Sequence, residues 1–190
     1  MIQLSNAFSD AVVATVCIVV FFKFFAYVPF HNRLLWGVFL VTVSLAAGAG
    51  VFRYLGFQQL TDTHRSLSTL AGSAGLASVV VAIWGLVMRQ TISRPTVIAT
   101  LSFGLILFIF LLYPAFQVFS SVVQAFTMLV VMLIAVFGLM QKYQKAIWIV
   151  IGVMILGIAT KVATQHLPFS PIDVYHYALA AMVFCFGKAV

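Results

Sequence analysis

Charged residues are scarce in this 190-residue chain, where they make up 7% of the sequence, and the acidic ones are three aspartates. Soluble domains carry roughly 25% charged residues, because their surfaces face water. So few charges cannot cover a water-exposed surface, which excludes a soluble globular domain and a disordered chain. Since 64% of the residues are apolar, we expect most of the protein to lie in lipid.

The basic residues do not form a patch, although the formal net charge is +7. They occur singly or in pairs at the ends of apolar runs, which is typical of membrane topology signals. This distribution excludes a nucleic-acid-binding module. The N-terminal stretch has no positive region before its apolar run, so we expect a retained span rather than a signal peptide. Cys17 and Cys185 lie in apolar runs without a metal or redox motif and are expected to be free thiols.

Seven apolar segments are long enough to cross a membrane, since a helical span needs about 20 mostly apolar residues. The uncharged run 95–140 is too long for one span. We expect it to break at Tyr113-Pro114, because proline removes a helix donor and disfavours helix in the residue before it. The expected spans are 8–30, 33–57, 67–89, 95–113, 115–140, 145–164 and 172–189.

Short polar joints connect these segments, so consecutive helices should be antiparallel neighbours. The sequence therefore predicts an all-α membrane protein, a single domain over 1–190 folded as a compact bundle of seven transmembrane helices. With the N-terminus outside, seven basic residues fall on the inner side and three on the outer side, so the positive-inside rule favours an N-out/C-in orientation. The inner residues are Lys23, Arg33, Arg89, Arg94, Lys142, Lys145 and Lys188, and the outer ones are Arg53, Arg65 and Lys161.

Polar side chains gather on the predicted outer side, where the three aspartates and three of the four histidines fall. Ionisable groups at membrane depth are costly, and they usually pair with each other or mark a functional site. We therefore expect an outward-facing polar cavity that binds a small ligand or a lipid headgroup, with Arg53 and Lys161 as counter-charges for an anion. An alternative is that these residues simply contact headgroups and water. The expected lining is Asp10, Arg53, Gln117, Ser121, Gln124, Lys161, Thr164, Asp173 and His176.

Several of these residues have a purely structural interpretation as well. In the stretch 170–173, Ser170 is a candidate N-cap and Asp173 the acid that answers the cap at the third helical position. His176 follows Asp173 by one turn, within reach of an Asp–His hydrogen bond. Asp62 and His64 are expected in the loop before the third helix.

Three stretches of the chain resemble a family of uncharacterised bacterial seven-span proteins, which implies a bacterial inner (plasma) membrane. The layout is more distantly similar to the superfamily of alkaline ceramidases and adiponectin/progestin receptors. The stretches are Ser9-Asp10, Ala46-Ala47-Gly48-Ala49-Gly50 and Pro171-Ile172-Asp173-Val174-Tyr175-His176.

The resemblance implies a zinc site, because members of that superfamily hydrolyse lipid amides with a zinc ion held by histidines beside an aspartate and a serine. It assigns metal-binding and catalytic roles to His176 and Asp10. His176 matches the second histidine of the superfamily's HxxxH pair, whereas the first falls on Ile172. A catalytic zinc needs about three protein ligands. Arg53 stands near the position where the bacterial relatives carry another histidine, so His64 or His166 would have to complete the set from a loop.

Three functions remain open from the sequence. The first is a membrane protein that binds or senses a ligand or lipid headgroup, and the second is a zinc-dependent membrane hydrolase acting on lipid amides. The third is a small-solute transporter, although no pair of similar halves or broken helices is visible. Membrane lipids are the expected partners.

Overall fold

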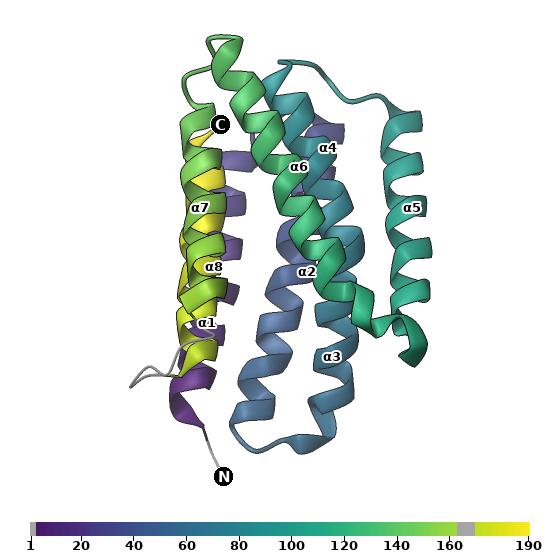
Figure 1. The fold of residues 1–190 in the computed structure, drawn as a ribbon, viewed down its shortest axis with the longest axis vertical. Coiled ribbons are helices and arrows are strands. Elements are labelled where there is room, and N and C mark those ends of the chain that lie inside the picture. The colour runs from purple at the N-terminus through teal and green to yellow at the C-terminus, as the bar shows by residue number, and fades with distance from the viewer. Residues whose placement is uncertain (1–2, 163–169) are drawn as a thin grey trace.

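A computed structural model describes residues 3–162 and 170–190 of the chain. Within these ranges the protein is all-helical and has no strand, and its long helices run up and down the molecule (Figure 1). The elements are α1 (Leu4–Val20), η1 (Phe21–Phe25), α2 (Phe30–Tyr54), η2 (Gln58–Leu60), α3 (Thr61–Leu70), η3 (Ala71–Gly75), α4 (Leu76–Val87), α5 (Arg94–Leu112), η4 (Pro114–Phe119), α6 (Ser120–Met140), α7 (Ala146–Val162) and α8 (Pro171–Lys188).

Five helices in the described residues are long and apolar enough to cross a membrane, as judged by length and composition. A sixth apolar helix, Ala146–Lys161, is shorter. Together they are compatible with a multi-pass membrane protein. The five are Leu4–Phe25, Phe30–Tyr54, Gln58–Val87, Arg94–Leu112 and Pro114–Met140.

The first two helices begin earlier than residues 8 and 33, where the sequence places them. Their polar first turns have partners inside the protein and therefore do not need water. On α1, Asn6 is buried and accepts a 2.9 Å hydrogen bond from Ser170. On α2, His31 and Asn32 bond to the backbone of the segment before α5, at Ile92 and Gln90.

The third long helix, Gln58–Val87, which comprises η2, α3, η3 and α4, also departs from the prediction, because residues expected in a loop are helical. This helix starts at Gln58 and includes α3, which carries Asp62 and His64. Its hydrophilic first turns lie beyond the apolar stretch used to predict the span. The break predicted at Tyr113-Pro114 is present, since α5 ends at Leu112 and η4 begins at Pro114.

The apolar core includes buried aromatic rings from η1, α2 and α8. Trp36 stacks on Phe25 with ring centroids 4.2 Å apart and makes an edge contact with Phe186. In contrast, α5 and α6 leave large apolar side chains exposed, including Phe103, Ile106 and Phe126. Such surfaces suit hydrocarbon rather than water.

Charge is divided between the two ends of the bundle. The end where α1 and α8 begin, termed the acidic end, carries Asp10, Asp62 and Asp173 and also the N-terminus, at the bottom of Figure 1. The C-terminus lies at the opposite, basic end. The basic end carries Lys23, Arg33, Arg89, Arg94, Lys142, Lys145 and Lys188.

Candidate functional site

Asp10 is the most unusual polar residue of the bundle, because its side chain is only 2% exposed near the start of an apolar helix. Its Oδ1 atom lies 3.3 Å from Nδ1 of His176 on α8. Its Oδ2 atom is buried and has no hydrogen-bond partner among the described residues. A buried acceptor without a partner costs about 1–3 kcal/mol and is rare in native proteins. Asp10 therefore marks a candidate site.

Glycine on α2 makes room for this carboxylate. A Cβ atom added at Gly50 would overlap Oδ2 of Asp10 and would lie 3.2 Å from the ring of His64. No other residue type leaves this space, so Gly50 allows α1, α2 and α3 to converge on one point.

Ser9 and Asp173 form the second layer of the site. The Ser9 hydroxyl lies 2.6 Å from Oδ1 of Asp173 and 3.0 Å from the carbonyl of Asn6, and both are acceptors for its proton. Ser5 donates to the other oxygen of Asp173. The carboxylate of Asp173 thus ties the start of α8 to two turns of α1.

The capping interpretation of this segment is confirmed in position, since Ser170 is the N-cap and Asp173 lies in the first turn of α8, but not in its side-chain hydrogen bonds. Ser170 is the N-cap of α8 but makes no side-chain cap bond, since its hydroxyl donates to Asn6. Asp173 likewise accepts from α1 and makes no direct hydrogen bond to His176 among the described residues. The side chains of Ser170 and Asp173 therefore bond to residues of α1 instead of to the backbone at the start of α8.

The hydrogen bonds fix the tautomer of His176. Its Nδ1 atom lies 3.1 Å from the Ser9 hydroxyl and 3.3 Å from Asp10. Because the single proton of Ser9 goes to Asp173 or to the Asn6 carbonyl, the Ser9 oxygen is left as an acceptor at Nδ1. The proton of a neutral imidazole is then on Nδ1. The Nε2 lone pair has no partner among the described residues.

His64 has the opposite arrangement. A guanidinium nitrogen of Arg53 lies 3.1 Å from its Nδ1 atom, and Arg53 can only donate. The proton of a neutral His64 is therefore on Nε2. Arg53 also donates to the hydroxyl of Tyr54 at 3.2 Å, and these contacts hold its charge at the edge of the site.

Asp10, His176 and His64 line one end of a cavity of about 800 Å³. Its other polar lining residues are Ser68, Ser121, Gln124, Thr160 and Tyr175. Toward the middle of the bundle the lining becomes apolar. The apolar part includes Val13, Phe39, Val43, Leu76, Met128, Val153, Leu156, Leu179 and Met182.

Four of the predicted lining residues belong to this cavity: Asp10, Ser121, Gln124 and His176. Four others do not line it, and Thr164 lies outside the described residues. The four are Arg53, Gln117, Lys161 and Asp173.

Each of the four has a physical reason to lie elsewhere. Arg53 is held by His64 and Tyr54, and Asp173 by two serines of α1. Gln117 is exposed in η4, a 3-10 helix, whereas Ser121 lies on the α-helix that follows it, α6. Lys161 is exposed near the end of α7. The cavity therefore lacks the basic counter-charges expected for an anion, and Asp10 is the only Asp, Glu, Lys or Arg in its described lining.

Sequence reasoning missed the role of Ser9 and Ser5, which orient the site through Asp173. Their signal was present, because Ser5 and Ser9 are one turn apart and Ser9 precedes Asp10 at the start of an apolar helix. His64 was expected in a loop because its neighbours in the sequence are polar. Tyr175 also lines the cavity, but nothing in the sequence singled it out as a lining residue.

The residues described here do not fit a zinc centre. No group of three or more His, Cys, Asp or Glu side chains in these ranges could hold a metal ion. His64 is turned to the Arg53 guanidinium, whose charge would oppose a cation. His166, the other expected ligand, lies outside the described residues. Asp10 and His176 remain as a close pair, with Oδ1 of Asp10 3.3 Å from Nδ1 of His176.

The cavity is least enclosed between α6 and α7. Among its lining residues, Ser121 and Ala125 on α6 and Gly157 and Thr160 on α7 are exposed. A Cβ atom at Gly157 would meet nothing within 4 Å. Toward the acidic end α6 leans away from α7 (Figure 1). The opening is thus flanked by two apolar helices.

A comparison with protein families gives one match, which spans residues 5–190 and is described as a family of unknown function, DUF6962. The chain belongs to this family. No curated protein and no solved structure matches the chain significantly. Functional inference for this DUF6962 member therefore depends on the geometry of the site.

Proposed function

We propose that this protein is a seven-span membrane protein that binds an amphipathic molecule, with its polar head at Asp10 and His176 and its tail in the apolar part of the cavity. One observation carries this function: Asp10 lines the polar end of the cavity, and its buried Oδ2 atom has no hydrogen-bond partner among the described residues. A ligand that donates a hydrogen bond there removes the cost of the unpaired acceptor.

The chemistry of the lining favours a head group with donors. Asp10 Oδ2 and His176 Nε2 are both acceptors on neighbouring residues of the site. An ammonium or a hydroxyl group supplies the matching protons. A carboxylate or phosphate head would instead face the acidic side chain of Asp10, with Arg53 and Lys161 outside the lining.

The opening between α6 and α7 supports a ligand that arrives from the bilayer. Its rims carry exposed apolar side chains, including Phe126 on α6 and Ile158 on α7. A molecule dissolved in lipid reaches such an opening without crossing water. This favours lipid-like amphiphiles over water-soluble solutes.

The proposed orientation is N-out/C-in, in a bacterial inner membrane. The division of charge between the two ends of the bundle agrees with the positive-inside rule, since Lys and Arg are concentrated at the basic end. Under this orientation the polar end of the cavity faces the outer leaflet.

A homologous ligand series tests the binding function. Dodecylamine, dodecanol and dodecanoate share one tail and differ in the head, so thermal unfolding of the protein in an uncharged detergent isolates the effect of the head group. We expect dodecylamine and dodecanol to raise the melting temperature of the wild type more than dodecanoate. At about 100 times the dissociation constant, binding stabilises a protein by about 2.7 kcal/mol.

The Asp10→Asn variant should lose most of this stabilisation by the amine and the alcohol. Asp62→Asn is the matched control, because Asp62 is at the same end of the bundle and its side chain is 93% exposed. Micelle partitioning of each amphiphile is the same for both variants. A larger shift with dodecanoate, or equal shifts for the two variants, would contradict the proposed function.

A further inference from the structure

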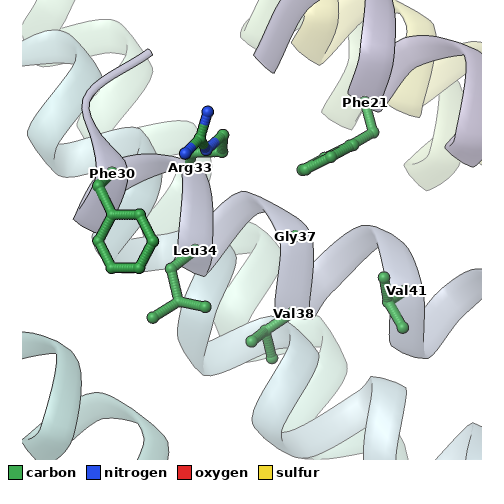
Figure 2. A pocket seen from close by; sticks show the side chains of 7 residues that line it. All are labelled: Phe21, Phe30, Arg33, Leu34, Gly37, Val38 and Val41. Carbon is green, nitrogen blue, oxygen red and sulfur yellow. The ribbon is translucent and has the colours of Figure 1, made fainter. Parts of the chain in front are cut away.

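A second hollow of about 340 Å³ lies on the outside of the bundle, against the basic half of α2 (Figure 2). Phe30, Leu34, Val38 and Val41 line it from α2, and Phe21 from η1 forms the facing wall. The lining is apolar apart from the side chain of Arg33. This groove is separate from the cavity at Asp10.

Residue spacing explains the groove. Its α2 residues stand at positions that follow one face of a helix, starting at Phe30 and ending three turns later at Val41. Gly37 in the middle of this face has no side chain, so the groove is left open beside the ring of Phe21. The result is a narrow apolar channel along the helix axis.

Arg33 lies near the end of the groove, between Phe30 and Phe21 (Figure 2). One of its terminal nitrogens donates to the carbonyl of Ala26 at 2.8 Å, and its guanidinium lies over the Phe30 ring. A guanidinium has five N–H donors. No ion pair of Arg33 with a carboxylate exists among the described residues, and all three aspartates of the chain are at the other end of the bundle.

The surroundings of Arg33 are those of a membrane interface. Tyr27 is 91% exposed and Phe30 is 63% exposed, both at the turn where α2 begins. Aromatic side chains are enriched at this depth in membrane proteins. Farther along the same face, Val41 is exposed as well, so in the proposed membrane orientation the groove extends from the interface toward the hydrocarbon region.

We propose that this groove binds an anionic phospholipid, with the phosphate on Arg33 and one acyl chain along Leu34, Val38 and Val41. Charge complementarity favours an anionic lipid over a zwitterionic one, because the neighbouring charged residues at the basic end, Lys23 among them, are cationic. Arginine donors also match phosphate oxygens in geometry. The site does not depend on the ligand proposed for the Asp10 cavity.

Native mass spectrometry of delipidated protein, with phosphatidylglycerol, phosphatidylcholine or diacylglycerol of the same chains added, tests this site. We expect the wild type to retain one phosphatidylglycerol molecule in preference to the other two lipids. Arg33→Gln should bind it about tenfold more weakly, the loss expected for one charge-assisted hydrogen bond. Gly37→Leu should weaken binding too, because its side chain fills the channel while Arg33 is unchanged.

Arg94→Gln is the matched control, since Arg94 is exposed at the same end of the bundle and does not line the groove. It should bind phosphatidylglycerol like the wild type, and Arg33→Lys should recover part of the affinity. Displacement of the lipid by inorganic phosphate alone would show that the tail makes no contribution and would overturn the lipid assignment. Equal retention of all three lipids, or full retention by both Arg33→Gln and Gly37→Leu, would also overturn it.

Discussion

Gly50 on α2 and Asp10 on α1 are in direct contact, and the glycine leaves no room for a Cβ atom beside the carboxylate. A neighbouring glycine of the same stretch, Gly48, has nothing within 4 Å of the position where its Cβ would stand. The two glycines therefore differ in their surroundings although both belong to the small-residue stretch 46–50.

Replacing Gly50 with alanine should displace Asp10 and destabilise the protein by about 1–3 kcal/mol, the usual cost of overpacking a buried site. Gly48→Ala, by comparison, should be neutral or stabilise by up to about 1 kcal/mol, because alanine favours helix. Thermal unfolding of both variants in the same detergent checks the pair. Equal melting temperatures would show that Gly50 does not set the position of Asp10.

The tautomer of His176 can be measured directly. Nitrogen-15 NMR of histidine-labelled protein should show the neutral ring of His176 protonated at Nδ1, because Ser9 and Asp10 both face that atom. His64 should show the Nε2 proton, since Arg53 donates to its Nδ1. Assignment comes from His176→Gln and His64→Gln. An Nε2-protonated His176 would remove the proposed acceptor from the cavity.

A bulky side chain at the opening between α6 and α7 should block ligand entry without unfolding the protein. Gly157→Phe is suited to this, because a side chain at position 157 meets open space beside the cavity. Its control, Ile158→Phe, changes an exposed apolar residue that does not line the cavity. We expect the association rate of dodecylamine to fall at least about tenfold for Gly157→Phe alone. An unchanged association rate would indicate another entrance.

The orientation is tested with single cysteines in a Cys17→Ala, Cys185→Ala background. Asp62→Cys, in α3 at the acidic end, should react with an impermeant thiol reagent on intact cells. Gln144→Cys, between α6 and α7 at the basic end, should react only after permeabilisation. The opposite labelling pattern would reverse the orientation and place the polar end of the cavity inside.

Apart from the start of the third helix, helix positions were predictable to within a few residues, and the errors at the starts of α1 and α2 have a common cause. Hydropathy treats Asn6, His31 and Asn32 as residues that need water, although each has a hydrogen-bond partner on another segment. Such partners are distant in sequence, so local composition cannot reveal them. The same reason explains why Asp173 was interpreted as part of a cap.

The candidate site was predictable in its acids and histidines and not in its geometry. Asp10 and His176 stand out because ionisable residues are rare in apolar helices. Ser9 became informative only once α1 and α8 were adjacent. Arg53 does not line the cavity because it bonds to His64, and from the sequence alone His64 was expected in a loop.

Composition alone predicted a helical protein suited to lipid, because backbone polar groups in a hydrocarbon-spanning helix bond within that helix and its side chains must be apolar. The same scarcity of polar residues drew attention to the few that are present. The tertiary structure decided which of them meet, through contacts between residues more than 160 positions apart such as Ser9 and Asp173. It also decided that one oxygen of Asp10 has no partner among the described residues, since that depends on how three helices pack around Gly50.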